Sequence, residues 1–140
     1  NWQRQQHREI SMQGTVSGSP QIILRLEGLL VLIAGSLAFS RLDYGWTIYF
    51  LYFFAPDISL LGYVAGPKVG SIVYNLGHSY VIPVAVALAG FSLDAPILLA
   101  AGFIWISHIG FDRALGFGLK YPKGFGYTHL GLIGKSRGGA

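Results

Sequence analysis

Residues 81–93 read VIPVAVALAGFSL, and residues 96–107 read PILLAAGFIWIS. Neither stretch contains a charged residue, and the same is true of residues 29–39. A helix of a water-soluble bundle needs a polar face, with charges along its length. Uncharged stretches of this kind are typical of helices surrounded by lipid, so the sequence predicts an integral membrane protein.

Four apolar segments come close to the roughly 17 to 25 residues that a helix needs to cross a bilayer. They cover about residues 22–39, 44–64, 69–91 and 95–111. The connections between them are short and contain Gly, Pro or a charged residue, as loops between antiparallel helices do. The sequence therefore predicts an all-α fold, an integral membrane bundle of four antiparallel transmembrane helices.

Polar tails flank the predicted bundle. Residues 1–21 show no helical or strand periodicity and end in small residues, so we expect a flexible tail. Within it, residues 1–11 are expected to precede a native start at Met12. Residues 122–140 are rich in Gly and basic residues and form a second predicted tail. The membrane domain is then expected to comprise residues 22–121.

Composition narrows the classes of function. Apolar residues make up 52% of the 140 residues and charged residues 11%, against about a quarter charged in soluble domains. The lack of Cys in the sequence excludes a disulfide scaffold and a thiolate metal site. The net charge of +4 comes from Lys and Arg near the ends of apolar segments, which suits anionic lipid headgroups. We therefore expect the lipid bilayer as a partner, and not nucleic acid.

The basic residues also predict an orientation. Arg4 and Arg8 precede the first span, Lys68 lies in the second connection, and Lys120 follows the fourth span. The first and third connections together hold a single basic residue, Arg41. The positive-inside rule then predicts that both termini are cytoplasmic, in a multi-pass protein of the bacterial inner membrane.

Four ionisable side chains lie within or at the end of the predicted spans, namely Asp57, His78, His108 and Asp112. The helical rise places all four in the cytoplasmic half of the membrane, where lipid does not solvate them. We expect them to gather in a cluster that faces the bundle interior. They are the candidate catalytic residues, since imidazole and carboxylate handle protons and also suit Zn, Mn or Fe.

Other roles for this cluster stay open at the level of sequence. It could be a hydrogen-bonded network that only fixes helix packing, or His78 and His108 could hold a haem. The sequence contains no HExxH motif, so it identifies neither a metal nor a cofactor. Pro56 is expected to loosen the helix around Asp57, because proline lacks a backbone N–H, and Pro83 could do the same above His78.

Further polar residues are candidates for binding a ligand. Asn75 lies three residues before His78 on the same helix face, so we expect it to orient that imidazole. Arg113 and Lys120 are candidates for binding a phosphate group, with anchoring at the membrane surface as the simpler alternative. His129 is expected to be exposed, with folding back under the cluster as the alternative.

Several motifs in a fixed order resemble one family of small bacterial membrane proteins. They are PDISLLGY at residues 56–63, YNLGHSY at 74–80, IWISHIGFDR at 104–113, GFGLKY at 116–121 and THL at 128–130. The sequence is similar to the family called domain of unknown function 4260, over about residues 24–130. The resemblance implies a compact membrane fold and a role for the motif positions, and it implies no particular activity.

Two hypotheses of function follow. In the first, the four ionisable side chains form a site, open to the cytoplasm, that binds or transforms a small or lipid-derived ligand. In the second, the protein is a non-catalytic accessory subunit that packs in a larger membrane complex through small residues, namely Gly66, Gly70, Ala85, Ala89, Gly102 and Gly110. The sequence alone does not decide whether the protein is an enzyme.

Overall fold

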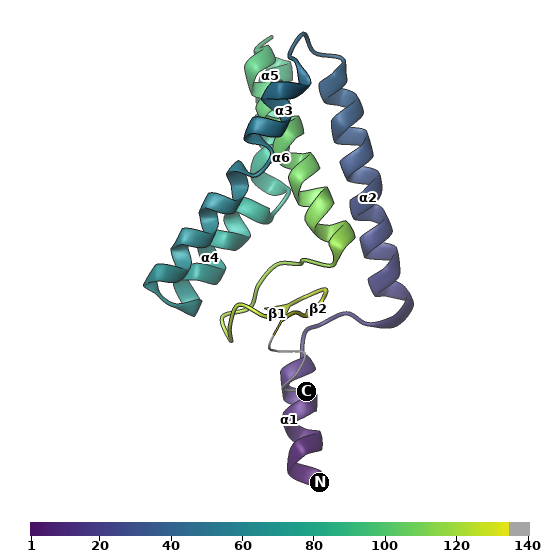
Figure 1. Cartoon of the computed structure of the whole chain (residues 1–140), viewed down its shortest axis with the longest axis vertical. Coiled ribbons are helices and arrows are strands. Elements are labelled where there is room, and N and C mark those ends of the chain that lie inside the picture. Colours follow the sequence, from purple (N-terminus) through teal and green to yellow (C-terminus); the bar gives the residue numbers. More distant parts are fainter. Residues whose placement is uncertain (135–140) are drawn as a thin grey trace.

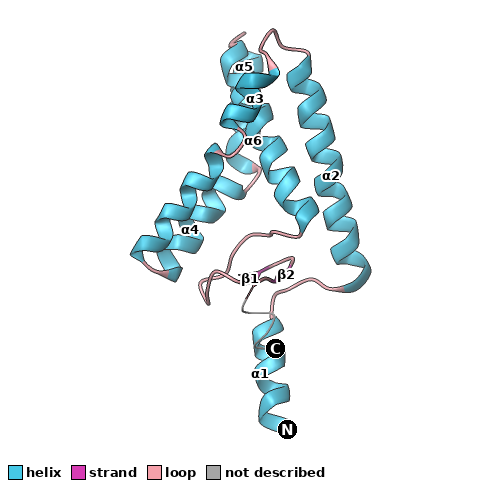
Figure 2. Ribbon diagram, viewed as in Figure 1, coloured by secondary structure: helices cyan, strands magenta, loops and turns pink. Residues whose placement is uncertain are grey.

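The computed structural model describes residues 1–134, which form a helical protein with one short hairpin (Figure 1, Figure 2). Its elements are α1 (Trp2–Met12), α2 (Gly18–Ser40), α3 (Trp46–Tyr52), the 3₁₀-helix η1 (Ala55–Ala65), α4 (Pro67–His78), α5 (Val81–Ser92), α6 (Pro96–Leu115), β1 (Tyr127–Thr128) and β2 (Gly131–Leu132). The predicted all-α class is confirmed. The basic residues Lys135 and Arg137 of the predicted C-terminal tail lie outside the described residues.

Four stretches are long and apolar enough to cross a membrane. They are Gly18–Ser40, Trp46–Ala65, Pro67–Ser92 and Pro96–Leu115. They correspond in order to the four predicted spans, with ends shifted by a few residues. Only the first and the last are continuous α-helices, because the second consists of α3 and η1 and the third consists of α4 and α5 (Figure 1).

The second span changes from α-helix to 3₁₀-helix at a proline. α3 ends at Tyr52, and η1 begins at Ala55 with Pro56 in its first turn. Proline has no backbone N–H to donate and disfavours the helical conformation in the residue before it, so the α-helix does not continue through this point. The expected loosening of the helix around Asp57 is confirmed.

The third span is interrupted directly after a histidine. α4 ends at His78, and Ser79 adopts an extended backbone. α5 begins at Val81 and carries Pro83 in its first turn, where a missing N–H breaks no helical hydrogen bond. Both interruptions therefore lie next to residues of the predicted cluster, Asp57 and His78.

α6 contacts α2, α5 and η1, and glycines let its neighbours approach closely. A Cβ atom on Gly110 would lie 2.6 Å from the backbone nitrogen of Leu32 in α2. A Cβ atom on Gly102 would lie 2.8 Å from the Cβ of Ala87 in α5. These positions have no room for a larger side chain, so the predicted small-residue faces of α6 are used for packing within the chain.

Aromatic rings fill the space between α2, α3 and α6. The buried rings of Phe39, Tyr49 and Phe53 follow one another with centroid separations of 5.2 and 5.4 Å, which is a favourable distance. The Tyr49 hydroxyl also forms a hydrogen bond of 2.7 Å with Ser36 of α2. Phe53 in turn contacts the ring of His108 at 5.4 Å. This core holds the end of α3 beside the predicted cluster.

The chain after α6 folds back against the bundle. Gly116 ends the helix with a φ of 90°, which glycine adopts without strain. The hairpin of β1 and β2 lies between the ends of α2 and α4 (Figure 1). The Gln21 amide donates a hydrogen bond to the Leu130 carbonyl, and Asn75 of α4 pairs with the backbone of Lys120. The chain after α6, from Lys120 to Leu130, therefore joins α2 to α4.

The N-terminal segment differs from the expectation of an irregular tail, because Trp2–Met12 form α1. This helix extends away from the bundle, below the hairpin (Figure 1). Lys123 donates a hydrogen bond of 2.9 Å to the carbonyl of Ile10 near its end. The described side chains of α1 are exposed. Trp2, Ile10 and Met12 are the only apolar residues in this segment, too few for the sequence pattern to reveal the helix.

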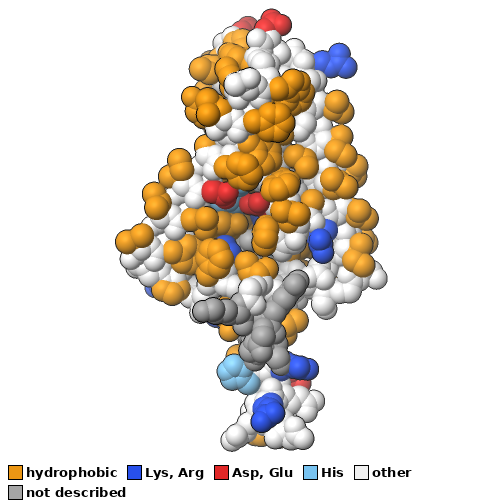
Figure 3. Space-filling model, in the orientation of Figure 1, with side chains coloured by type: hydrophobic (Ala, Val, Ile, Leu, Met, Phe, Trp, Pro, Cys, Tyr) orange, Lys and Arg blue, Asp and Glu red, His pale blue; other side chains and the backbone are white. Residues whose placement is uncertain are grey.

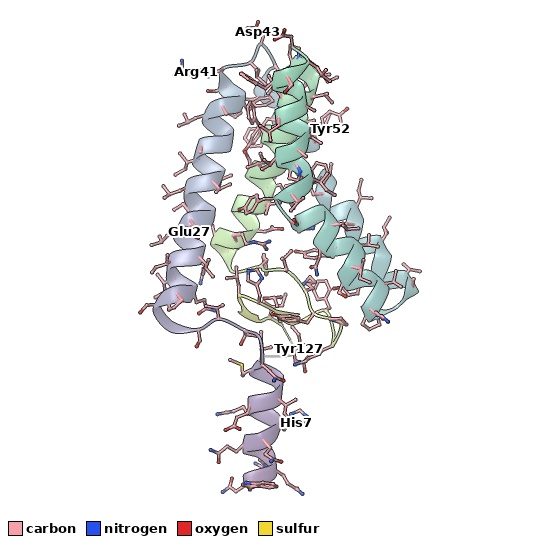
Figure 4. All side chains as sticks on the ribbon, turned by 180° about the vertical axis from the view of Figure 1, so that it is seen from behind. His7, Glu27, Arg41, Asp43, Tyr52 and Tyr127 are labelled. Atoms are coloured by element: carbon pink, nitrogen blue, oxygen red, sulfur yellow. The ribbon has the colours of Figure 1, made fainter. Side chains whose placement is uncertain are left out.

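Charged residues mark the end of the molecule opposite to α1. Figure 4 shows Arg41 and Asp43 in the loop after α2 at that end, whereas His7 lies on α1 at the other. The hairpin of β1 and β2 is found near α1 (Figure 1). The described terminal segments thus share one end of the bundle, as four antiparallel spans require. The side of the membrane that this end faces remains a prediction of the positive-inside rule.

Cysteine labelling tests the orientation. The sequence has no Cys, and Ser17 and Ser92 are both exposed, so a single Cys at either position reports without background. We expect Ser92→Cys to react with a membrane-impermeant maleimide in intact cells. We expect Ser17→Cys to react only after the membrane is opened. Labelling of both variants from the same side would contradict the arrangement of four spans.

Candidate metal centre

Three elements bring four ionisable side chains together where the second and third spans are interrupted. Asp57 comes from the first turn of η1, His78 is the last residue of α4, and His108 and Asp112 lie one turn apart on α6. One nitrogen or oxygen atom of each lies within 4.8 Å of those of the other three. The predicted cluster is therefore confirmed.

The four side chains direct one atom each toward a common centre. The Nε2 atoms of His78 and His108 are 3.2 Å apart. Each of them lies between 3.1 and 3.3 Å from Oδ1 of Asp57 and from Oδ2 of Asp112. Two imidazole nitrogens and two carboxylate oxygens thus surround one point.

A backbone carbonyl determines which nitrogen of His78 carries a proton. Nδ1 lies 3.0 Å from the carbonyl oxygen of Tyr74, which can only accept a hydrogen bond, so Nδ1 is the protonated atom. The Tyr74 ring stacks on the imidazole at a centroid distance of 3.8 Å and holds its plane. In the neutral form of His78, Nε2 therefore turns a lone pair toward the two carboxylates.

The lone pairs of an imidazole and two carboxylates repel one another unless a cation lies between them. A proton joins one pair of atoms at a time and brings that pair closer than the others. Five of the six distances between these atoms are nearly equal, from 3.1 to 3.3 Å, and the sixth, between the two carboxylate oxygens, is at most 4.8 Å. A tetrahedral ion with bonds of about 2.0 Å holds its ligand atoms about 3.3 Å apart. Five of the six spacings therefore fit a tetrahedral metal ion.

The centre is closed on one side and accessible on the other. The side chains of His78 and His108 are fully buried and that of Asp112 is 11% exposed, whereas that of Asp57 is 36% exposed. Figure 3 shows acidic side chains at the middle of an otherwise hydrophobic face. A ligand would therefore reach the centre past Asp57.

His108 is held by packing. The rings of Phe53 and Phe54 meet its imidazole edge-on, at centroid distances of 5.4 and 5.9 Å. Its Nδ1 atom is buried and has no hydrogen-bond partner within residues 1–134. Its Nε2 atom faces the other members of the cluster. The aromatic contacts thus take the place of the hydrogen bond that usually orients a metal-binding histidine.

The haem alternative does not fit this geometry. Two axial histidines bind a haem from opposite faces, so the porphyrin plane has to lie between their nitrogen atoms. The Nε2 atoms of His78 and His108 are 3.2 Å apart and face the same two carboxylates. This arrangement leaves no space for a planar macrocycle.

The last carbonyl groups of α4 have no partner within the helix, and side chains of α6 donate hydrogen bonds to two of them. The indole N–H of Trp105 donates to the Gly77 carbonyl at 2.6 Å, and Arg113 donates to the His78 carbonyl at 2.8 Å. Unpaired carbonyls are costly within a membrane, so these bonds allow the helix to end at the centre. Sequence analysis missed this role of both residues, and their positions on either side of His108 were the only signal.

Asn75 has a different partner from the one expected. Its side-chain N–H donates to the Lys120 carbonyl at 2.8 Å, and its Oδ1 accepts the Lys120 N–H at 2.7 Å. The Asn75 amide thus bonds both backbone groups of Lys120, as a residue of a neighbouring β-strand does. These two hydrogen bonds attach the segment after α6 to α4. The groups that orient His78 are the ring and the carbonyl of Tyr74.

The structure brings together two other candidate ligand-binding residues, Arg113 and His129. Both line a cavity of about 430 Å³, together with Glu27, whose carboxylate disfavours an anionic ligand. His129 is half-buried, so the expectation of an exposed side chain is wrong. Its Nδ1 accepts the Leu119 N–H at 2.8 Å, and burial lowers the pKa of the imidazole.

Lys120 is buried among aromatic rings. Its ammonium group donates to the Phe125 carbonyl at 2.8 Å and lies 3.6 Å from the centroid of the Phe125 ring and 4.8 Å from that of Tyr74. Burial lowers the pKa of Lys120 to about 8, although the charge of Asp112 opposes the shift. These contacts hold the side chain within the protein, so it is not exposed for the alternative role of anchoring to lipid headgroups.

Comparison with known proteins extends the resemblance carried by the motifs. The family model described as Domain of unknown function (DUF4260) matches residues 21–133, which is most of the chain. The chain belongs to the DUF4260 family. The matched region contains all four residues of the His/Asp cluster of this family member. No curated protein and no solved structure shows a significant match, so the function of this DUF4260 member has to be argued from its site.

Lys120 predicts a pH dependence of stability. Because burial lowers its pKa from 10.5 to about 8, the unfolded chain binds more protons than the folded one between these values. Stability therefore rises with pH in this window. We expect the thermal midpoint in detergent to rise from pH 8 to pH 10 in the wild type relative to Lys120→Met. Lys123→Met, at an exposed position, should keep the wild-type slope, and equal slopes in all three proteins would contradict the prediction.

Proposed function

We propose that the protein is a membrane-embedded metal protein that binds a divalent transition-metal ion through Asp57, His78, His108 and Asp112. The observation that carries this proposal is the near-equal spacing of their four facing atoms, from 3.1 to 3.3 Å over five pairs. Two imidazoles and two carboxylates at tetrahedral spacing suit Zn²⁺ best among the common metals.

Charge balance supports the same proposal. A carboxylate in an apolar surrounding costs several kcal/mol when no cation compensates it. One divalent ion neutralises both Asp57 and Asp112, whereas protonation balances them only when both histidines of the cluster carry an extra proton. The guanidinium of Arg113, the residue after Asp112, is engaged with the backbone carbonyls of Phe117 and His78.

We assign different roles to the four ligands. His78, His108 and Asp112 are the most buried and serve as the three fixed ligands. Asp57 is the most exposed and belongs to the first turn of a 3₁₀-helix, so it is the ligand that yields to an incoming oxygen atom. Catalytic zinc sites keep three protein ligands and one exchangeable position. A displaced Asp57 carboxylate could then accept the proton of a water molecule at that position.

Such a site binds an oxygen-bearing small or lipid-derived ligand and is suited to metal-assisted hydrolysis. The basic residues near the end of α6 support a location in the cytoplasmic half of a bacterial inner membrane. For the accessory-subunit hypothesis, Gly70, Gly102 and Gly110 give no support, because each meets another element of the same chain and its small size is already required for packing within the protein. Gly66, where an added Cβ atom would meet nothing within 4 Å, and Ala85, which is exposed, stay compatible with contact to a partner.

Metal binding tests the proposal directly. We expect metal-free protein in detergent to take up about one Zn²⁺ per chain, measured by native mass spectrometry and by titration. His108→Gln and Asp112→Asn keep the size of the side chain and remove one ligand. Their Zn²⁺ affinity should fall by more than the roughly 10- to 100-fold that follows loss of a group orienting a metal ligand.

His7→Gln is the matched control, because His7 is exposed on α1 and lies outside the centre. This variant should bind Zn²⁺ as the wild type does. Circular dichroism of each variant separates loss of a ligand from loss of the fold. If the wild type binds Zn²⁺, Co²⁺, Mn²⁺ and Fe²⁺ no better than His108→Gln does, the cluster is a packing network and the proposal is wrong.

A further inference from the structure

A groove lies between α3 and α6, and Pro56, the residue before Asp57, is among the residues that line it. Its volume is about 550 Å³, within the roughly 300–1,000 Å³ of typical ligand sites. Residues that line it include Ile48, Tyr52, Pro56, Ile97, Ala101 and Trp105. The lining side chains are apolar apart from tyrosine hydroxyls and the Trp105 indole N–H, which is already bonded to the Gly77 carbonyl.

Small side chains create this groove. Ala55 of η1 and Ala100 and Ala101 of α6 line it, between the larger side chains of Tyr52 and Ile104. Alanine leaves free the volume that a leucine or phenylalanine would fill. The groove is therefore a consequence of the alanines in η1 and α6. Beside the groove, α3 and α6 pack together through the aromatic core.

One end of the groove adjoins the metal centre. Pro56 lines it and directly precedes Asp57, the most exposed of the four ligands. Ile104 also lines it and lies one helical turn before His108. A molecule that occupies the groove therefore has one end beside the ligand that we expect to exchange.

The groove leads away from the C-terminal end of α6. His108 lies seven residues before Leu115, the last residue of α6, which is about 10 Å along the helix. From Trp105, at the middle of α6, to Ile97, near its start, the groove follows the helix for about 12 Å away from that end. A lipid with its polar part at the centre therefore places its chain in the half of the span nearer to the start of α6.

We propose that the groove binds one acyl chain of a glycerophospholipid, whose ester or phosphate oxygen reaches the metal ion beside Asp57. This inference rests on the proposed function, because it needs the metal ion at the centre. It assigns a substrate class to the site, namely an amphipathic lipid with an oxygen-rich head.

The surroundings of the groove favour a membrane lipid over a soluble ligand. Its walls belong to two stretches that are long and apolar enough to cross a membrane. Tyr52 and Ile97 on opposite walls are 56% and 68% exposed, so a large apolar surface flanks the opening. Such a surface is in contact with lipid, and a polar ligand from water would have to cross it. Oxygen atoms of a lipid head are suitable ligands for Zn²⁺.

Cobalt substitution tests this inference. Tetrahedral Co²⁺ absorbs visible light, and its bands shift when an oxygen ligand enters or replaces a carboxylate. We expect dioleoylphosphatidylglycerol, added to the detergent-solubilised Co²⁺ protein, to shift these bands in a saturable way. The detergent alone should leave the bands unchanged. An equal shift by the same concentration of oleate would overturn the assignment of a glycerophospholipid.

Filling the groove provides the matched comparison. Ala101→Trp should raise the phospholipid concentration for half of the shift by about tenfold or more, with Co²⁺ affinity unchanged. Ala34→Trp makes the same change on an exposed part of α2 and should behave as the wild type does. Ala101 is exposed, so the larger side chain displaces no buried contact, and Ala101→Leu is the milder second variant.

The outcomes distinguish the two proposals. If the wild type shows no tetrahedral Co²⁺ bands, the proposed metal centre is wrong and the lipid inference fails with it. If the bands are present but phospholipid does not shift them, only the lipid inference is wrong. The same conclusion holds if Ala101→Trp and Ala34→Trp respond to phospholipid equally.

Discussion

The hydrogen bonds at an interrupted helix are the constraint on which this structure depends. When α4 ends at His78, the Gly77 and His78 carbonyls need donors that lipid does not offer. Trp105 and Arg113 of α6 supply them. The same bonds hold the end of α4 against α6, and they thereby place the His78 imidazole beside that of His108. The break in the helix and the metal centre are therefore parts of one arrangement.

Sequence patterning predicts the features that depend on hydrophobicity and on spacing along a helix. The gathering of His78, His108 and Asp112 followed from the cost of isolating ionisable groups in lipid and from the four-residue spacing on α6. The orientation of His78 did not follow, because it depends on the Tyr74 carbonyl and ring. Asn75 was assigned the wrong partner because the segment that it bonds is far away in sequence.

The segment after α6 shows a second limit of such reasoning. A basic residue beyond the last span predicts a position at the membrane surface, and Lys120 instead lies under the rings of Tyr74 and Phe125. Leu130 and Thr128 are fully or almost fully buried in the same segment, although its composition is that of a loop. Burial here results from contacts with α2 and α4, which are distant in sequence, so local composition does not report it.

The docking of Lys120 on Asn75 attaches α4 to α6 a second time, since α6 continues directly into the segment that carries Lys120. The first attachment is at the metal centre, three residues further along α4. With two separate points of attachment, the pair of η1 and α4 can rotate against α6 only about the line that joins these points. The short segment 116–120 links the C-terminal end of α6 to α4. The distances between the metal ligands are thus maintained partly by a loop that contributes no ligand itself.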